Sequence, residues 1–209
     1  MIRLGTIAPD KLNLNGDQGN LLALSKFLRL AGFEVEVLPV SNFDQALACN
    51  FLILGHGSIA AMQSLDATFE RLNLGVAVGT VPGLAIGSGF EYLSRVGLVD
   101  QKIQPRPRQS EFAIGQIGPV KALGYRNTDS GLPNLALNGQ WICSMLHGPL
   151  FAKNPILLMR AAKATVAAAQ MPWPTELPVS LLQWIDDLNE ICSRIWKLET
   201  EATFEPLIP

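Results

Sequence analysis

A short glycine turn is the place in this sequence where residue types and spacing best fit catalysis. The apolar run Leu84–Ile86 leads into Gly87, Ser88 and Gly89, and the residues that follow predict a helix. A buried strand that turns sharply into a helix is how α/β enzymes expose a nucleophile, and the amides at the helix start can stabilise an oxyanion. Ser88 is therefore a candidate nucleophile. The alternative is a tight turn in which Ser88 only caps the helix.

One of the two histidines stands where a general base is needed. His147 ends another strand-like run, and an imidazole is the usual activating partner of a serine or cysteine nucleophile. Together, Ser88 and His147 are the obvious catalytic pair when the residues are considered without any family.

The three cysteines provide little chemistry by their positions. Cys49 precedes a buried run, Cys143 stands four residues before His147, and Cys192 falls in a terminal helix. An odd, scattered set predicts no disulfide framework, and no pair of Cys or His has the spacing of a zinc site, so we expect neither a metal nor a cofactor. We interpret all three as small buried apolar residues, with Cys143 kept as an alternative nucleophile.

The elements that must position these residues alternate between strands and helices in the first half of the chain. Apolar runs predict strands, and apolar residues at helical spacing lie between them. The expected strands are Ile2–Ile7, Val35–Val40, Phe51–Leu54 and Leu84–Ile86. This order predicts a parallel sheet with helices on both faces, whose ligand sites lie at the carboxyl ends of the strands. Those ends are Gly55–Ser58 and Gly87–Gly89.

The second half of the chain changes in texture from about Lys102. Prolines and glycines separate short apolar runs, which predicts an irregular antiparallel region over residues 103–146. Asn154 then precedes Pro155 as an expected helix cap. We expect a domain over residues 1–170 and a linker with an amphipathic helix over 171–209. That helix docks either on its own domain or on a partner. Its predicted apolar stripe consists of Leu181, Leu182, Ile185, Leu188, Ile191, Ile195 and Leu198.

Composition excludes several function classes. Of the 209 residues 48% are hydrophobic, which excludes disorder, and the net charge of −2 offers no footprint for nucleic acid. No apolar run is long enough to span a membrane, and the first residues lack a signal-peptide layout. We expect a cytoplasmic protein. Only 16% of residues are charged, against a typical quarter, which predicts an apolar surface covered by a partner chain.

Three blocks carry a resemblance to a known family. The first is Asp10–Asn20, the second combines Phe51–Ser58 with Pro82–Leu93, and the third is Leu146–Leu150 with Lys153–Pro155 behind it. In this order they resemble the class I glutamine amidotransferases of the cobyric-acid-synthase-like group, most closely the glutaminase subunits of lipid II isoglutaminyl synthases. The resemblance implies a flavodoxin-like, three-layer α/β domain with a mostly parallel central sheet.

The resemblance also implies a site and a partner. In the family, a cysteine at the strand-to-helix turn, called the nucleophile elbow, attacks glutamine, and a histidine activates this cysteine. The released ammonia passes to a Mur-ligase-like partner that amidates a peptidoglycan precursor. The base position corresponds to His147, and backbone amides near Gly57 correspond to the oxyanion hole. The nucleophile position corresponds to Gly87, which has no side chain and cannot form a covalent intermediate.

Other positions depart from the family pattern too. Ile59–Met62 replaces a polar run, and Glu91 replaces a glutamine. Arg126 is a candidate substrate contact, while Gly131 stands where the family's arginine is expected. Ser88 lies one residue beyond the nucleophile position and therefore on a different face of the turn. Several losses at one site predict a degenerate glutaminase.

The polar loop before the first helix is retained. Asp10, Asn13, Asp17 and Asn20 correspond to the face that the family turns toward its ligase partner, although such residues also stabilise loops by themselves.

The leading hypothesis is a scaffolding subunit in a heterodimer with a Mur-ligase-like protein, which would bind glutamine only if activity is retained. Two alternatives stay open. One is an active amidase or hydrolase that uses Ser88 or Cys143 with His147, and the other is a relative serving cobyrinate-type amidation.

Overall fold

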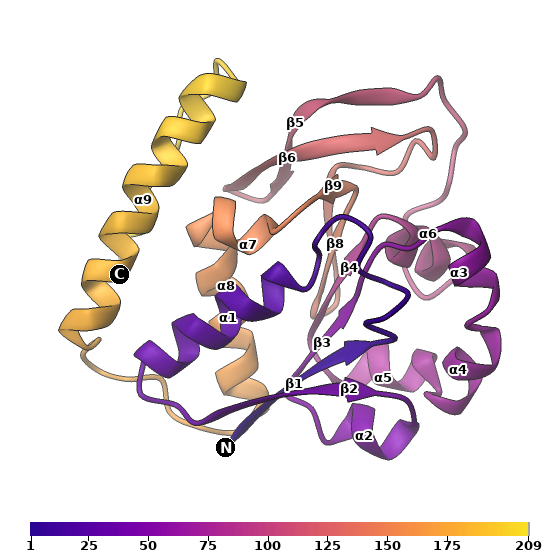
Figure 1. Cartoon of the computed structure of the whole chain (residues 1–209), viewed down its shortest axis with the longest axis horizontal. Coiled ribbons are helices and arrows are strands. Elements are labelled where there is room, and N and C mark those ends of the chain that lie inside the picture. Colours follow the sequence, from indigo (N-terminus) through magenta and orange to yellow (C-terminus); the bar gives the residue numbers. More distant parts are fainter. Residues whose placement is uncertain (209) are drawn as a thin grey trace.

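A twisted six-stranded sheet forms the centre of the computed structural model, which describes residues 1–208 (Figure 1). The strand order is β2-β1-β3-β4-β8-β7, and every neighbouring pair is parallel except the last. The strands are β1 (Ile2–Ile7), β2 (Val35–Val40), β3 (Phe51–Leu54), β4 (Gly83–Ile86), β7 (Leu135–Asn138) and β8 (Trp141–Ser144). The mostly parallel sheet predicted from the alternating pattern is thereby confirmed.

Helices cover both faces of this sheet, which makes the fold three-layered. One face is covered by α1 (Gly19–Leu30), α8 (Pro155–Ala168) and α9 (Val179–Glu199). The other face packs against α2 (Phe43–Leu47), α3 (Ile59–Gln63), α4 (Asp66–Arg71), α5 (Leu74–Thr80) and α6 (Ser88–Arg95). A short α7 (Leu150–Lys153) precedes α8. No helix within residues 1–208 combines the length and the apolar character needed to cross a membrane.

The alternation of side chains in the central strands explains why the two cores are separate. In β3, Phe51 and Ile53 belong to the core under α1 and α8, whereas Leu52 and Leu54 belong to the core under α3–α6. Successive side chains of a strand point to opposite faces, so a strand covered on both sides reads as an unbroken apolar run. This is why the short runs at β3 and β4 are predictable from the sequence.

The antiparallel pairing expected in the region 103–146 is confirmed, but its strands are divided between two sheets. Only β5 (Gln109–Ile117) and β6 (Val120–Thr128) join β9 (Leu146–His147) in a separate antiparallel sheet. β7 and β8 instead complete the large sheet, where β8 runs parallel to β4. The physical reason is a close approach at Gly83, where a β-carbon would lie 2.6 Å from the indole of Trp141.

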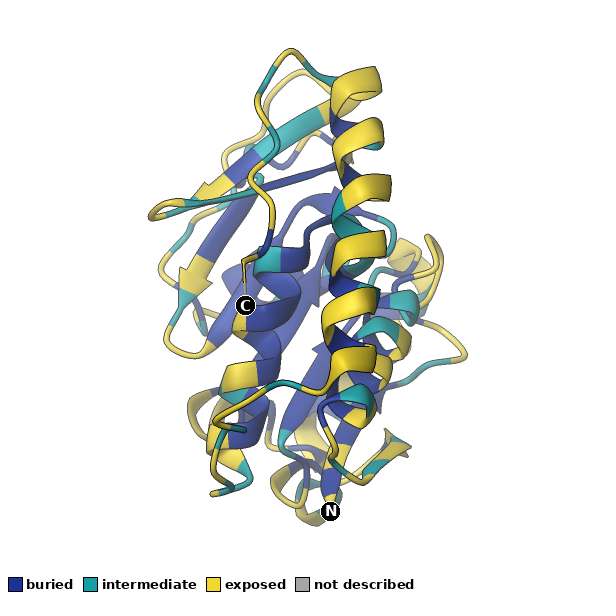
Figure 2. Cartoon of the chain, turned by 90° about the vertical axis from the view of Figure 1, so that its left-hand side faces the viewer, coloured by how far each residue is buried: buried dark blue, intermediate teal, exposed yellow. Residues whose placement is uncertain are grey.

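The terminal helix docks on its own domain, which decides between the two expected arrangements. Leu181, Ile185, Cys192 and Trp196 form its buried face, and the indole N–H of Trp196 donates to a backbone carbonyl of α7. Figure 2 shows this helix with its exposed residues turned outward. The predicted stripe is therefore only partly the buried one, since its members include exposed residues that lie beside the true docking face.

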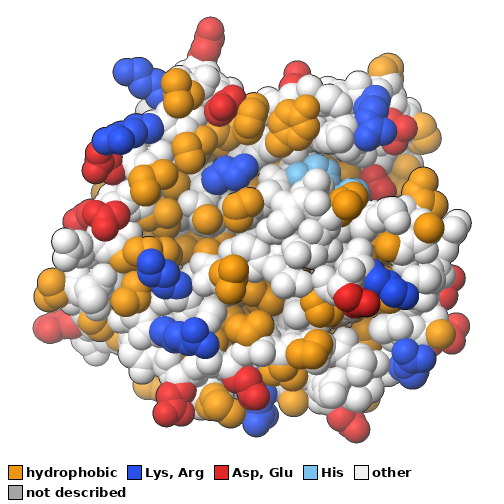
Figure 3. Space-filling model, in the orientation of Figure 1, with side chains coloured by type: hydrophobic (Ala, Val, Ile, Leu, Met, Phe, Trp, Pro, Cys, Tyr) orange, Lys and Arg blue, Asp and Glu red, His pale blue; other side chains and the backbone are white. Residues whose placement is uncertain are grey.

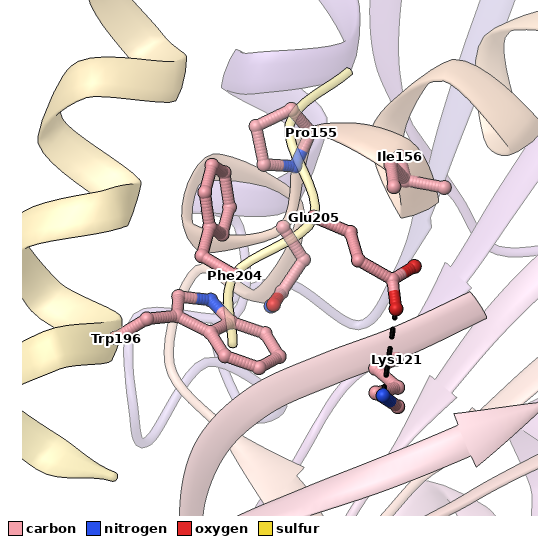
Figure 4. A pocket seen from close by; sticks show the side chains of 7 residues that line it. Lys121, Pro155, Ile156, Trp196, Phe204 and Glu205 are labelled. Carbon is pink, nitrogen blue, oxygen red and sulfur yellow. Dashed lines mark ion pairs between the residues drawn. The ribbon is translucent and has the colours of Figure 1, made fainter. Parts of the chain in front are cut away.

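The segment after α9 folds back over the domain. Phe204 packs against Trp196 with ring centroids 5.8 Å apart, and Glu205 lies 3.4 Å from the ammonium of Lys121 on β6 (Figure 4). Leu207 is buried. These contacts hold the C-terminal residues against α8 and β6 and stabilise the position of α9.

Asn154 stands at the N-cap position of α8, as expected, but its side chain makes no cap bond. It bonds instead to both the N–H and the carbonyl of Leu123 on β6, and to the carbonyl of Leu150. The residue therefore ties the antiparallel sheet to α7. A buried amide with three backbone partners is a strong constraint on how the two sheets sit together.

Candidate active site

The turn between β4 and α6 has the backbone of a nucleophile elbow. Gly87 has φ +54° and ψ −118°, a conformation that other residues rarely adopt, and its N–H donates to the carbonyl of Ser144 at 2.8 Å. A β-carbon at this position would lie 2.5 Å from Nδ1 of His56 and 2.6 Å from Cε1 of His147. Position 87 thus aims at two imidazoles, although its own side chain is a hydrogen atom.

His147 reaches the elbow from the antiparallel sheet. It pairs with Tyr125 in the β6–β9 register and is buried. Its Nδ1 lies 3.0 Å from Nδ2 of Asn15. A side-chain amide nitrogen can only donate, so Nδ1 of His147 is the acceptor. Burial, reinforced by the neighbouring His56, lowers the pKa of His147 to about 4. The imidazole is therefore neutral at pH 7 and, among the described residues, it has no carboxylate hydrogen-bonded to it.

His56 contacts the backbone amide of Ser88, close to the region that the family resemblance assigns to an oxyanion hole. The N–H of Ser88 donates to its Nδ1 at 3.0 Å, and its ring meets that of His147 edge-on with centroids 4.6 Å apart. Because Nδ1 accepts an amide proton, this nitrogen is unprotonated. Burial lowers the pKa of His56, and the charge of Glu91 opposes that shift. The neutral imidazole therefore engages the Ser88 amide, which is then not free to donate to a substrate.

The second donor is blocked by Ser88 itself. The N–H of Gly57 donates to Oγ of Ser88 at 2.9 Å, and this hydroxyl in turn donates to the carbonyl of Gly57 at 3.1 Å. The proton of the serine therefore points to a backbone carbonyl and not to an imidazole. Both amides that would stabilise an oxyanion are engaged by the chain's own side chains.

Asp17 supports this closed arrangement from below. Its Oδ2 accepts the backbone N–H of His56 at 2.7 Å, and its Oδ1 is buried with no hydrogen-bond partner among the described residues. Burial raises the pKa of Asp17 to about 6, and the bond to the His56 N–H opposes the shift. Asp17 fixes the loop that carries His56, so it contributes to the site indirectly.

The polar loop is thus divided between the interior and the surface. Asn20 is buried and accepts the N–H of Phe151 at 2.8 Å, while its amide donates to the carbonyl of Asp17 at 2.9 Å. Asp10 and Asn13 are exposed. Of the four residues expected to face a partner, only these two present their side chains to the surface. Asp17 holds the loop on the His56 segment, and Asn20 holds it on the segment after His147.

Arg126 lies away from the elbow. Its guanidinium is buried and donates to the carbonyl of Leu132 and to the side chain of Asn134. Burial lowers the pKa of Arg126, and the positive charge of Arg106 lowers it further. The arginine therefore braces the loop before β7. Glu91 points toward the same region and accepts the hydroxyl of Thr128 at 3.1 Å.

A cleft of about 200 Å³ opens beside the elbow. Its lining includes His56, Gly57, Ile59, Met62, Ser88 and Glu91. Ile59 and Met62 make one wall apolar, as their positions in the sequence predict. The cleft has space for a small molecule, and its other lining residues are polar: Gln63, Asp66, Tyr92 and Arg95. Ser88 is the one aliphatic hydroxyl in this lining, and it is engaged with Gly57.

The cysteines contribute no nucleophile in this arrangement. All three are buried and unpaired, and burial raises the pKa of Cys143 to about 12 and that of Cys49 to about 11. Cys143 belongs to the apolar core under α3–α6. A protonated thiol in such surroundings is inert. Within residues 1–208 no group of His, Cys, Asp and Glu is arranged to hold a metal ion.

Sequence patterns identified the elbow and His147, but they placed Asp17 in a partner-facing loop and left His56 either as a remnant of an oxyanion region or as a loop residue without a role. Asn15, Asp17 and His56 act through contacts with distant segments, and the only signal for them is that they stand near the ends of β1 and β3. Polar residues at the carboxyl ends of neighbouring parallel strands converge on one edge of the sheet.

The histidine environment can be tested directly, because the chain has only two. We expect neither imidazole to titrate with the ordinary midpoint near pH 6.5, and the midpoint of His147 to lie near pH 4, since burial disfavours the charged ring. Proton NMR of the ring C–H signals between pH 3.5 and 8, with His147→Gln for assignment, measures this. A midpoint above pH 6 for His147 would contradict the closed, neutral site.

No family model matches the sequence, and no curated protein sequence matches it. Solved structures do match the fold. One is a glutamine amidotransferase at TM-score 0.52 and 14% identity, covering 80% of this chain and 99% of that one. The glutaminase domain of Trypanosoma brucei CTPS, solved with bound acivicin, matches at TM-score 0.51 and 12% identity over 86% and 99%. A glutamine amidotransferase from Thermotoga maritima matches at TM-score 0.50 and 10% identity over 96% and 99%. The chain therefore has the fold of the class I glutamine amidotransferases.

Proposed function

We propose that this chain is a glutamine amidotransferase-like subunit that does not hydrolyse glutamine itself and works by binding a synthetase partner. The observation that carries the proposal is the elbow at Gly87, which aims at His56 and His147 without a side chain. Covalent catalysis at this position needs a thiol or hydroxyl. The engaged amides of Gly57 and Ser88 add a second, independent loss, because a tetrahedral intermediate would find no free donor.

The proposed partner is a Mur-ligase-like protein that amidates a peptidoglycan precursor. This finer assignment rests on the three sequence blocks and on their resemblance to the glutaminase subunits of lipid II isoglutaminyl synthases. Asp10 and Asn13 are exposed at the loop that the resemblance turns toward the ligase. In this role the chain stabilises or positions the ligase, which then uses free ammonia.

The rebuilt-site alternative has less support from the geometry. Ser88 would have to break both of its bonds to Gly57 before attacking a substrate, and Cys143 would have to leave an apolar core. No contact in the structure favours a cobyrinate-type substrate over the peptidoglycan precursor.

The experiment combines the purified chain with a Mur-ligase-like protein from the same genome and measures amidation of the precursor. We expect stable co-purification, product formation with ammonium chloride, and no product with glutamine. We expect the chain to raise the ammonium-dependent rate of the ligase. Release of ammonia from glutamine at ordinary enzyme rates would overturn the lost-activity claim, and failure to bind any such ligase would overturn the partner.

His147→Ala is the matched control. It removes the imidazole at the base position, so a scaffold should keep its effect on the ammonium-dependent reaction. If the substitution abolished product formation from glutamine while the ammonium-dependent rate persisted, the rebuilt-site enzyme would be the better account.

A further inference from the structure

The terminal helix carries a second apolar stripe beside its buried face. Trp184, Leu188, Ile191, Ile195 and Leu198 follow one another at intervals of 4, 3, 4 and 3 residues, the spacing of the a and d positions in a coiled coil. We call these five residues the α9 seam. None of them is fully buried, and the exposed fractions of Ile191 and Leu198 are 54% and 81%.

The seam borders the face that docks α9 on its own domain, and its first two residues, Trp184 and Leu188, are partly buried against that domain. At its first residue, Trp184 meets the ring of Phe27 on α1 and lies under the ammonium of Lys26. Leu188 also packs partly against this core, whereas Ile191 and Leu198 further along the helix are exposed. Figure 3 shows hydrophobic side chains gathered on the side of the molecule where α9 stands. Large apolar side chains in a continuous helical row are typical of an interface.

The charges that border the seam are divided along the helix. On its outer flank Asp187 and Glu190 come first, and Arg194 and Lys197 follow. The helix macrodipole does not explain the acidic half, because α9 begins at Val179 and the dipole acts within the first turn. The Arg194–Glu190 pair within the helix is exposed and therefore weak, so it does not prevent these charges from pairing elsewhere.

We propose that a second copy of this chain covers the seam, with the two α9 helices antiparallel and crossing near Ile191. In an antiparallel pair, the acidic half of this flank on each helix lies beside the basic half of the same flank on the other, whereas in a parallel pair the two charged flanks would lie on opposite sides of the interface and could not pair. The seam is then self-complementary, as a two-fold interface requires. This inference does not depend on the proposed function, because the seam lies on another element than the elbow.

Sedimentation equilibrium of the chain from about 1 to about 200 μM tests the proposal, since a short helical interface lies at the small end of specific contacts. We expect a reversible dimer. Ile191→Asp and Leu198→Asp should each raise its dissociation constant at least about tenfold. Val179→Asp is the matched control, because Val179 is an exposed apolar residue of the same helix away from the seam, and it should leave the constant unchanged.

A charge exchange tests the orientation. Asp187→Arg should weaken the dimer, and adding Arg194→Asp in the same chain should restore it. Circular dichroism confirms the fold of each variant. A chain that stays monomeric over the whole range, or a dimer that survives both seam substitutions, would overturn the interface. A double exchange that fails to restore association would overturn the antiparallel arrangement.

Discussion

Gly87→Cys combined with His56→Ala should create a reactive thiol, whereas Gly87→Cys alone should not. At position 87 a β-carbon meets His56 Nδ1 at 2.5 Å, so the single substitution overpacks the site and also strains a residue held at positive φ. Together these effects should destabilise the fold by about 3 kcal/mol. Removing the His56 ring relieves the closest contact and frees the N–H of Ser88 as a donor. The contact with Cε1 of His147 at 2.6 Å remains, so the His147 ring must shift to admit the new side chain. The new thiol then lies beside the neutral imidazole of His147, which can take its proton.

Iodoacetamide labelling followed by peptide mass spectrometry measures this. The three native thiols are buried and should stay unlabelled in the folded protein, so the double variant should take up a single equivalent. Adding His147→Ala should slow labelling by roughly 10- to 100-fold, because the thiol loses its base. We do not expect glutamine turnover from this variant, since Ile59 and Met62 leave one wall of the cleft apolar. Equal labelling with and without His147 would show that the elbow no longer aims at the base.

Asp17→Asn should stabilise the protein at neutral pH and change how its stability depends on pH. Burial raises the pKa of Asp17 from 3.8 to about 6, so the native state favours the protonated acid. This preference contributes up to about 3 kcal/mol to the free energy of unfolding. The contribution is fully present below pH 4 and is lost as the pH rises through 6. Asparagine keeps an acceptor for the His56 N–H without a charge. The side-chain nitrogen of the asparagine would stand where Oδ1 of Asp17 has no hydrogen-bond partner. We expect a net gain of about 1–2 kcal/mol in the free energy of unfolding at pH 7.

Asp17 and His147 make the free energy of unfolding change in opposite directions as the pH rises. The pKa of His147 is lowered to about 4, so its contribution is present above pH 6.5 and is lost as the pH falls through 4. In the natural chain the two trends oppose each other. In Asp17→Asn the histidine trend should stand alone, and the free energy of unfolding should fall between pH 6.5 and 4.5. Urea unfolding across that range measures it, with the exposed Asp10→Asn as control. If the free energy of unfolding depended on pH in the same way in Asp17→Asn and in the natural chain, the proposed cost of burying the charged Asp17 would be contradicted.

The strands at the centre of the sheet could be predicted because their burial leaves a local signature. Runs such as Phe51–Leu54 are apolar at every position since both faces are covered, and a glycine follows each of them. The place of β8 could not be predicted. Its parallel pairing with β4 joins segments almost 60 residues apart, and a short apolar run reads the same in either sheet.

The terminal helix shows the same limit at the level of one element. Its 3.6-residue period is evident, but two neighbouring stripes share that period, and only packing decides which one is buried. Cys192 and Trp196 belong to the docking face, while Ile191 and Leu198 remain outside. Apolar character alone does not distinguish a residue that packs against its own domain from one that is exposed and available to another chain.

By itself, the sequence determined the α/β order of elements, the elbow, and the absence of a nucleophile at Gly87, because each depends on residues adjacent in the chain. Only the tertiary structure decided that the site is closed. His56 accepts the N–H of Ser88, Asn15 reaches His147 across a separation of 132 residues, and Asp17 is held inside the molecule. Such contacts depend on which strand ends meet at one edge of the sheet. That meeting is a property of the folded chain, and no local pattern encodes it.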